Sequence, residues 1–410
     1  MKRYEEYKDS GVQWLGKVPS HWEDCKIKFI ASCNDDVLSE KTNTTEIIDY
    51  VEIGDVVYGQ GITNSTQYEF TDAPSRARRI TRKGDIIVST VRTYLKAIAP
   101  IDDTEPIVST GFAVIRPRKI DSLFASFAFI SNLFVEKIVS LSVGVSYPAI
   151  NASQIVNIKI PCPPLPEQQS IASFLDAKTK PIDDIIAKRE KQIELLEEMK
   201  VAIISHAVTK GLNTNAKMKD SGIEWIGEVP SHWDVIRLKF CGKIKSGDSL
   251  SKDNISDIGS IEVYGGNGFI GYTSLCNITP PAIIIGRVGA LCGNVRLVTS
   301  EKWVSDNALI LYIHHKLSYQ YTSLILQAVN LNRLNTSSAQ PLITGSKIMN
   351  VFIPTPPLPE QRTIASYLDT ETAKIDARIA KRRKQIALLQ EYKQALITDA
   401  VTGKIDVRGN

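Results

Sequence analysis

Apolar residues recur at alternating steps of four and three along two long stretches of the chain, 161–209 and 354–402. This heptad spacing predicts a long helix in each stretch that packs against a facing helix. The seam positions of the first stretch are Leu175, Thr179, Ile182, Ile186, Arg189, Ile193, Leu196, Lys200, Ile203 and Ala207. Those of the second are Leu368, Thr372, Ile375, Ile379, Arg382, Ile386, Leu389, Lys393, Leu396 and Ala400. Because the two series differ at one position only, Ile203 against Leu396, each helix is the obvious partner of the other.

The two stretches are copies of one another that align without a gap. Each opens with the motif PPLPEQ, whose prolines fit only the first turn of a helix and whose glutamate suits a helix N-terminus. Gly211 and Gly403 are the expected C-terminal stops. Each helix therefore spans roughly 42 residues, or about 63 Å. The interval between the copies is far too long for a solenoid repeat, so the chain consists of two similar halves.

Two features disturb this pattern. Pro181 should kink or locally break the first helix, whereas the second copy has Lys374 at that position. Arg189 and Arg382 stand in the middle of the apolar stripe. They either extend to the rim of the seam or fix the pairing of the helices, and the sequence leaves both interpretations open.

A second duplication, KDSGVQWLGKVPSHW at 8–22 and KDSGIEWIGEVPSHW at 219–233, precedes a globular region in each half. Its tryptophans are expected to anchor the segment to its domain. His21 and His232 are interpreted as structural, because no carboxylate or nucleophile motif lies near them in the sequence. The anchoring tryptophans are Trp14, Trp22, Trp225 and Trp233.

The two globular regions, about 23–160 and 234–353, share a pattern although most residues differ. The pattern predicts two copies of a mixed α/β domain, so the overall class is α+β. The expected counterparts are the buried strands 85–91 and 282–288, the strands 112–115 and 308–313, the helical segments 123–139 and 317–331, the glycine-containing segments 57–62 and 263–270, and the closing segments 148–160 and 341–353.

The composition, with 43% hydrophobic and 23% charged residues over 410 positions, excludes a disordered or fibrous chain. A net charge of +4 is compatible with a nucleic-acid partner. The six cysteines lack metal-site spacing and are expected to be reduced thiols of a cytoplasmic protein. The polar start, MKRYEEYKDSG, predicts no signal peptide, and no apolar run approaches the length of a membrane span.

The first globular region carries a dense group of cations between Pro74 and Lys96, with Asp85 as the single acid. Arginine and lysine interspersed with hydroxyl side chains suit phosphate contacts, and arginine can pair with guanine. A solvated basic face is the alternative. The candidates for DNA contact here are Arg76, Arg78, Arg79, Arg82, Lys83, Arg92, Tyr94 and Lys96.

The second region is less basic, and its glycine-rich loop 264–268 fits either a close approach to a ligand or a tight hairpin turn. Its candidates are Tyr264, Asn267, Arg287 and Arg296, with Arg237, Lys239, Lys243 and Lys245 as further cations. The closing segments add the matched polar positions Tyr147, Asn151 and Gln154 in the first half and Gln340, Thr344 and Lys347 in the second.

The chain has no phosphate-binding loop, no GxGxxG after a strand, no Asn-Pro-Pro-aromatic run, no HExxH and no recognisable Ser/His/Asp set. It therefore resembles a reader without chemistry of its own. The alternatives are a stand-alone DNA methyltransferase or nuclease with unrecognised catalytic residues, and a protein-only scaffold on a long coiled coil.

The chain combines the duplicated PPLPEQ heads, the continuations IASFLD and IASYLD, the long helices behind them and the duplicated segments 8–22 and 219–233. By these features it resembles the specificity subunit of type I restriction–modification enzymes. The resemblance covers essentially the whole chain. It implies target-recognition domains at 1–160 and 211–353, and spacer helices at 161–210 and 354–410 that pack antiparallel with pseudo-twofold symmetry.

The resemblance also implies a function. Each recognition domain would read one half of a bipartite, asymmetric DNA site, while the spacers set the gap, at most about 18 base pairs. The partners would be double-stranded DNA, two modification subunits and restriction subunits. S-adenosylmethionine, ATP and magnesium would be bound by those partners, and no cofactor or metal by this chain. The family's motifs carry over no base-reading residue, so the DNA-contact candidates rest on charge and position.

Overall fold

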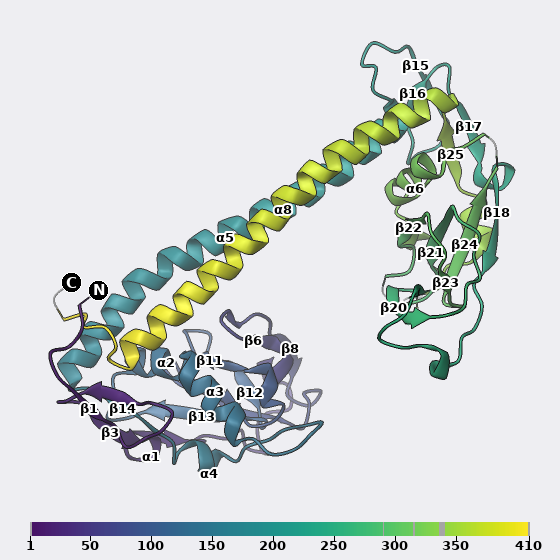
Figure 1. The fold of residues 1–410 in the computed structure, drawn as a ribbon. Coiled ribbons are helices and arrows are strands. Elements are labelled where there is room, and N and C mark those ends of the chain that lie inside the picture. Colours follow the sequence, from purple (N-terminus) through teal and green to yellow (C-terminus); the bar gives the residue numbers. More distant parts are fainter. Residues whose placement is uncertain (1, 290, 315, 336–340, 409–410) are drawn as a thin grey trace. The chain divides into compact units, whose positions relative to one another are not determined.

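The computed structural model describes residues 2–289, 291–314, 316–335 and 341–408. The chain divides into two compact units. Unit 1 comprises Met1–Glu190 with Arg383–Asn410, and unit 2 comprises Lys191–Arg382. Each unit therefore holds one globular part and a length of both long helices (Figure 1).

The two long helices are α5 (Leu165–Lys210) and α8 (Leu358–Val401), as the heptad pattern predicted. In unit 1 the first half of α5 lies against the last half of α8, and in unit 2 the roles are exchanged, so the helices pair antiparallel. A lysine on the seam reaches an aspartate of the facing helix in each unit: Lys393 Nζ lies 2.6 Å from Asp183, and Lys200 Nζ lies 2.7 Å from Asp376.

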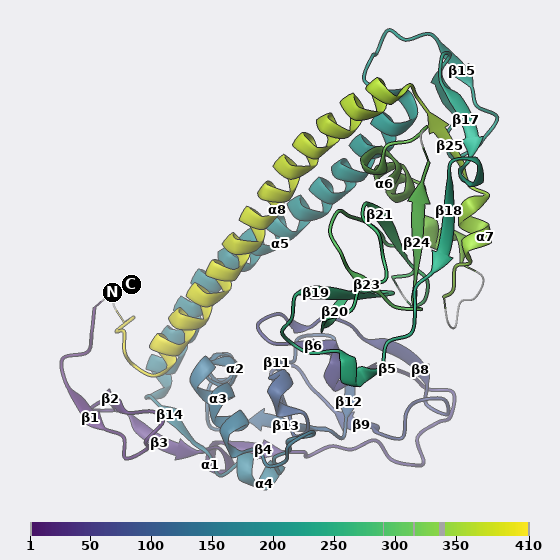
Figure 2. The same ribbon diagram turned by 45° about the vertical axis from the view of Figure 1, so that its right-hand side comes forward.

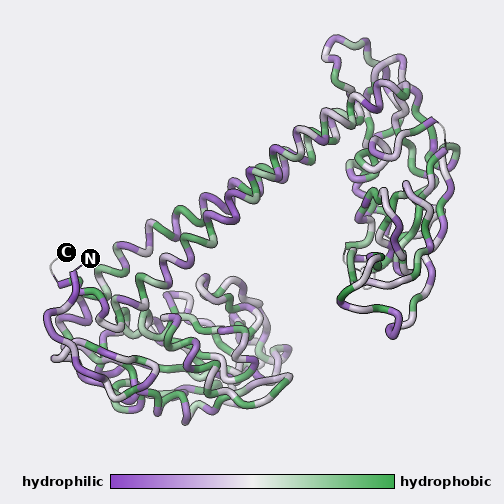
Figure 3. Tube along the Cα trace, viewed as in Figure 1, coloured by the Kyte–Doolittle hydropathy of each residue, from purple (hydrophilic) through white to green (hydrophobic). Residues whose placement is uncertain are grey.

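Every predicted seam residue is buried or half-buried, which confirms the seam. Figure 3 shows apolar positions recurring along both helices among polar ones. The predicted break at Pro181 is wrong, because α5 continues through it. Pro181 is exposed, while Ile182 and Ile186 beside it are buried in the seam, and this packing offsets the lost backbone hydrogen bond. Arg189 and Arg382 are half-buried and engaged with other residues.

The globular part of unit 1 contains two four-stranded sheets and several short pairs (Figure 2). The first sheet has the order β11 (Ile98–Pro100), β10 (Ile86–Ser89), β13 (Phe112–Pro117), β4 (Ala31–Cys33). The second has the order β8 (Thr66–Glu69), β5 (Ile47–Val51), β12 (Ile107–Ser109), β9 (Ala77–Ile80). The pairs are β1 (Tyr7–Asp9) with β2 (Lys17–Pro19), β3 (Glu23–Lys26) with β14 (Lys159–Cys162), and β6 (Val56–Val57) with β7 (Gly61–Ile62). The helices are α1 (Ile27–Ile30), α2 (Ser122–Ile130), α3 (Asn132–Leu141) and α4 (Ala152–Ile155), with 3-10 turns η1 (Ile53–Asp55) and η2 (Thr93–Leu95).

The globular part of unit 2 repeats this frame in a smaller form. One sheet has the order β18 (Gly242–Ser246), β24 (Ala308–Ile313), β21 (Ala282–Gly286), β22 (Val295–Val298), and the other β20 (Gly268–Thr273), β19 (Ile261–Gly265), β23 (Trp303–Val304). The pairs are β15 (Met218–Asp220) with β16 (Glu228–Pro230) and β17 (Asp234–Arg237) with β25 (Phe352–Thr355). The helices are α6 (Tyr319–Ala328) and α7 (Gly345–Met349), with 3-10 turns η3 (Leu238–Phe240), η4 (Lys252–Asn254) and η5 (Leu331–Leu334).

The predicted strands and helices of the globular regions are present, with two differences. The helical segment 123–139 is two helices that meet at Ser131. The proposed match of 57–62 with 263–270 is wrong. Val263 and Tyr264 of β19 pair in parallel with β23, as Tyr50 and Val51 of β5 pair in parallel with β12. Strand β19 therefore corresponds to β5. Segment 57–62 instead contributes to the β6–β7 hairpin, inside a longer β5–β8 connection.

The long helices complete the core of each unit. In unit 1, Ile171 and Leu175 of α5 and Ile397 of α8 join the apolar cluster around Trp22 and Phe124. In unit 2, Ile204 and Val208 of α5 and Leu368 of α8 join the cluster around Trp233 and Tyr321. Within the described residues no single helix is long and apolar enough to cross a membrane; only the bent pair α2 and α3 passes that test, on length and composition alone.

Candidate nucleic-acid interface

Both duplicated motifs meet at the junction of a long helix with its globular part. His21 Nε2 lies 2.8 Å from Glu167 Oε2, and the Trp22 indole N–H donates to Glu167 Oε1 at 3.1 Å. In unit 2, His232 Nε2 lies 2.9 Å from Glu360 Oε2. No motif near His21 indicates its carboxylate partner, because Glu167 lies 146 positions away in the sequence.

The glutamine of each PPLPEQ motif holds the core helix of the same unit. Gln168 Oε1 accepts the N–H of Asp121, which caps α2, and Gln361 Oε1 accepts the N–H of Ser318, which caps α6, both at 2.8 Å. The junctions therefore fix where each globular part stands on its helices. Burial and the Glu167 carboxylate raise the pKa of Tyr4, which donates to that carboxylate at 2.7 Å.

The basic segment of unit 1 is partly neutralised by its own surroundings. Three of its cations form ion pairs: Arg82 with Asp36 at 2.8 Å, Lys83 with Asp103 at 2.7 Å and Lys96 with Glu136 at 2.6 Å. These pairs lower the net positive charge that the segment offers to a phosphate backbone.

The remaining arginines of the segment differ in exposure. Arg78 places its guanidinium 5.0 Å from the centre of the Phe70 ring, and Arg76 is exposed immediately before β9. Arg79 is half-buried, and its Nε has no hydrogen-bond partner among the described residues. Arg76 is therefore the better placed of these three for a phosphate.

The structure brings Arg92 and Tyr147 together, although the sequence separates them, and exposed Tyr94 follows Arg92 in η2. Val91 pairs with Ala149 in an isolated antiparallel bridge, and the Arg92 guanidinium lies 5.4 Å from the centre of the Tyr147 ring. Asn151 instead caps α4 in a capping box with Gln154, which gives it a structural role beside this group.

In unit 2 a second group forms on the β19–β20 hairpin. The Arg296 guanidinium lies 5.8 Å from the centre of the Tyr264 ring and donates to the Asn267 carbonyl at 3.4 Å. Phe269 packs edge-on against Tyr264 and is half exposed. The glycine-rich loop is thus a hairpin turn that also supports an arginine.

The other candidates of unit 2 lie near the start of α7. Thr344 caps this helix, Lys347 Nζ donates to the Leu334 carbonyl at 3.0 Å, and the Arg287 carbonyl accepts the Ile343 N–H at 2.9 Å. Gln340 lies outside the described residues.

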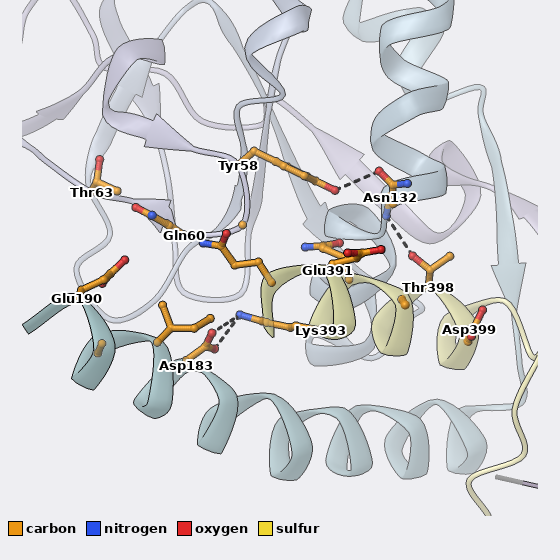
Figure 4. A pocket seen from close by; sticks show the side chains of 16 residues that line it. Tyr58, Gln60, Thr63, Asn132, Asp183, Glu190, Glu391, Lys393, Thr398 and Asp399 are labelled. Atoms are coloured by element: carbon orange, nitrogen blue, oxygen red, sulfur yellow. Dashed lines mark hydrogen bonds and ion pairs between the residues drawn. The ribbon is translucent and has the colours of Figure 1, made fainter. Parts of the chain in front are cut away.

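A cavity of about 810 Å³ in unit 1 lies between the β6–β7 hairpin, the start of α3 and the paired helices. Figure 4 shows Lys393 reaching Asp183, and Asn132 lying between Tyr58 and Thr398. In the part of the chain that the structure describes, no group of three or more His, Cys, Asp or Glu residues is placed to hold a metal ion. All six cysteines are free thiols, and burial together with the neighbouring Cys25 raises the pKa of Cys162 to about 12.

Comparison with known proteins identifies the duplicated architecture. The family "Type I restriction modification DNA specificity domain" matches residues 19–195 and 230–388. The chain belongs to this family. It is a DNA specificity subunit of a type I restriction–modification system with two target-recognition domains, and the subunit is itself non-catalytic. The predicted family, fold class and absence of chemistry of its own are confirmed.

Two curated relatives come from Methanocaldococcus jannaschii. The MjaVIII specificity subunit is 28% identical over 310 residues, covering 65% of this chain and 66% of the relative. The putative MjaX specificity subunit is 26% identical over 437 residues, covering 96% of each chain. A chain from a structure titled "Structural basis underlying complex assembly and conformational transition of the type I R-M system" has the same fold, with a TM-score of 0.68 at 22% identity over 95% of this chain and 99% of that one.

Proposed function

We propose that the specificity subunit reads a bipartite, asymmetric DNA site, with one half read by each globular part. The observation that carries this proposal is that a shared frame presents different exposed groups. Unit 1 offers Arg92 with Tyr147 beside η2, whereas unit 2 offers Arg296 with Tyr264 on a hairpin. The functional divisions are then 1–160 and 211–353 for recognition, and 161–210 and 354–410 for spacing.

The paired helices act as the spacer between the half-sites and as the docking surface for two modification subunits. Equivalent positions on the two helices leave large apolar side chains exposed: Leu195 and Met199 on α5 correspond to Leu388 and Tyr392 on α8. One such patch belongs to each unit. Two equivalent patches suit two copies of one partner, because exposed apolar surface of this kind marks interaction sites.

The covalent work belongs to the partners. Modification subunits bind S-adenosylmethionine and methylate adenine in each half-site, and restriction subunits use ATP and magnesium for translocation and cleavage. The assembly operates in the cytoplasm on double-stranded DNA. The proposed DNA contacts of this chain are the candidates named from the sequence, with Arg76, Arg92, Tyr94, Tyr147, Tyr264, Asn267 and Arg296 the best exposed or best grouped.

The test is to express the chain with its modification subunits and map methylated adenines across a genome. Replacing residues 234–353 with those of another family member should change one half-site and leave the other half-site and the gap unchanged. Changes in both half-sites would refute separate reading. Inserting one heptad within 183–200 should alter the gap alone, and an unchanged gap would refute the spacer role.

A further inference from the structure

Two segments of unit 1, 90–96 and 142–150, are joined by hydrogen bonds into one loop pair. Backbone hydrogen bonds run from Ile150 N–H to the Thr90 carbonyl at 2.9 Å and in both directions between Val143 and Ala149 at 2.9 and 3.0 Å. The Thr93 hydroxyl donates to the Ser142 hydroxyl at 2.7 Å. These bonds hold the backbone of the loop pair in place before any ligand arrives.

The backbone of the loop pair is strained at two residues that carry long cationic side chains. Arg92 has a φ of 51° and Lys96 a φ of 54°, in the left-handed region that disfavours residues other than glycine. Such strain concentrates at functional sites. Lys96 is ion-paired with Glu136, whereas Arg92 forms no ion pair among the described residues. Glycine would fit position 92 with less strain, so an arginine at this position lowers the stability of the fold.

The arginine is oriented by an aromatic ring and surrounded by exposed apolar side chains. The Tyr147 ring lies under the Arg92 guanidinium at 5.4 Å, which limits its rotamers. Tyr94, Leu95, Val143, Val145 and Tyr147 are all exposed, from 39% for Leu95 to complete exposure for Val145. An oriented guanidinium fork beside apolar groups matches a guanine O6 and N7 next to a thymine methyl in the major groove.

We propose that Arg92 is a specificity-determining residue that reads a guanine in the half-site recognised by unit 1, with Tyr147 as its positioning residue. This inference rests on the proposed function of the chain. The ion-paired cations of the basic segment contribute little to this discrimination, since their charge is already neutralised within the unit. The Tyr147 ring orders the Arg92 guanidinium before binding. This reduces the entropy cost of forming the bidentate pair with guanine.

The test is Arg92→Gly in the full complex with the modification subunits, with methylated adenines mapped across the genome. Glycine relieves the left-handed strain, so the variant should fold at least as well as the parent chain. We expect the preference for one guanine to fall about ten- to a hundredfold in the half-site that the 234–353 exchange leaves unchanged. The other half-site and the gap should remain as they are.

Two further variants sharpen the outcome. Arg92→Lys keeps the charge and loses the fork, and should relax the same position more weakly than glycine does. Arg333→Ala removes another arginine stacked on a ring, 5.8 Å from Trp225 in unit 2, and should leave that guanine preference intact. An unchanged consensus with Arg92→Gly, or the same change with Arg333→Ala, would overturn the role of Arg92. A parent complex without any bipartite site would instead refute the proposed function.

Discussion

Unit 1 and unit 2 attach to the long helices through the same junction, but they satisfy its polar groups differently. In unit 1 the Glu167 carboxylate accepts from Tyr4 and Trp22 and contacts His21. In unit 2 Glu360 contacts His232, and the buried Trp233 indole N–H has no partner among the described residues. The duplication therefore preserved the position of the backbone and the aromatic ring more strictly than the hydrogen bonds around them.

The backbone requirement is visible at the glycines that end the helices. Gly403 has a φ of 73°, and a Cβ there would collide with the Pro19 side chain, beside Trp22. Gly211 has a φ of 74°, and a Cβ there would lie 3.1 Å from the Trp233 ring. Both positions thus favour glycine for conformation, and Gly403 also requires it for space, beside the tryptophan at which each helix stops.

The central sheets place different side chains at one equivalent position, which is buried in unit 1 and half-buried in unit 2. Arg116 of β13 donates to both oxygens of Asp85, at 2.8 and 2.7 Å, and to Asp36 at 2.7 Å. The corresponding residue of β24 is Tyr312, whose hydroxyl accepts the Thr279 N–H at 3.2 Å. Unit 1 thus depends on a charge network where unit 2 uses an aromatic side chain.

The largest expected effect comes from breaking that network. Arg116→Ala leaves Asp85, which is 2% exposed, without its ion-pair partner and should destabilise unit 1 by about 3 to 5 kcal/mol. Tyr312→Phe removes only the hydroxyl at the corresponding position of unit 2 and should cost less than about 1 kcal/mol. Hydrogen exchange of the β10 and β13 amides, against those of β21 and β24, measures each unit separately. Equal losses in the two units would contradict the difference.

Acid should weaken the same network more gradually. Hydrogen bonds from Arg116 hold the pKa of Asp36 below its ordinary value. Burial opposes the shift at Asp35, but hydrogen bonds from Ser32 and Arg118 lower its pKa. A carboxylate with a lowered pKa stabilises the fold above its ordinary pKa, and this stability is lost as the pH falls through the lowered value.

The expected result is that unit 1 opens before unit 2 as the pH is lowered from 4 to 2. Unit 2 has Glu262, whose pKa is lowered by a hydrogen bond from Lys302. Burial raises the pKa of Asp24 in unit 1, which offsets part of the effect, since protonation of that group favours the folded state. Pepsin cleavage mapped by mass spectrometry reports the order of opening, and earlier cleavage within β21 and β24 would contradict it.

The sequence predicted the elements that depend on local pattern and could not predict the contacts that depend on topology. The seam residues, the helix stops at Gly211 and Gly403 and the buried strands follow from periodicity and backbone chemistry. The ion pairs of Arg82, Lys83 and Lys96 do not, because Asp36, Asp103 and Glu136 reach these cations only through the fold. The grouping of Arg92 with Tyr147 is likewise set by pairing between distant segments.

The two tryptophans of the junction provide a matched test of the hydrogen-bond difference. Trp22→Phe and Trp233→Phe remove similar volume from similar sites. Only the first also removes an N–H that donates to a carboxylate, so it should cost about 1.5 to 3 kcal/mol more. Exchange rates of the amides in α2 and α6 measure the two losses. A larger loss for Trp233→Phe would mean that its indole N–H has a partner in solution.

The smallest expected difference concerns the seam lysines, where the two units make the same contact. Lys393 is 13% exposed beside Asp183, and Lys200 is 32% exposed beside Asp376. Partly exposed ion pairs contribute about 0.2 to 1 kcal/mol, and Lys393→Met should lose more than Lys200→Met because its pair is better shielded from water. Methionine keeps the apolar stem of the lysine, so the comparison isolates the charge. Thermal unfolding followed at low and at high salt checks this, since added salt should reduce the effect of Lys200→Met more than that of Lys393→Met. An identical salt response of the two variants would show that both pairs are equally solvated, and that the duplicated helices are matched in electrostatics as closely as they are in sequence.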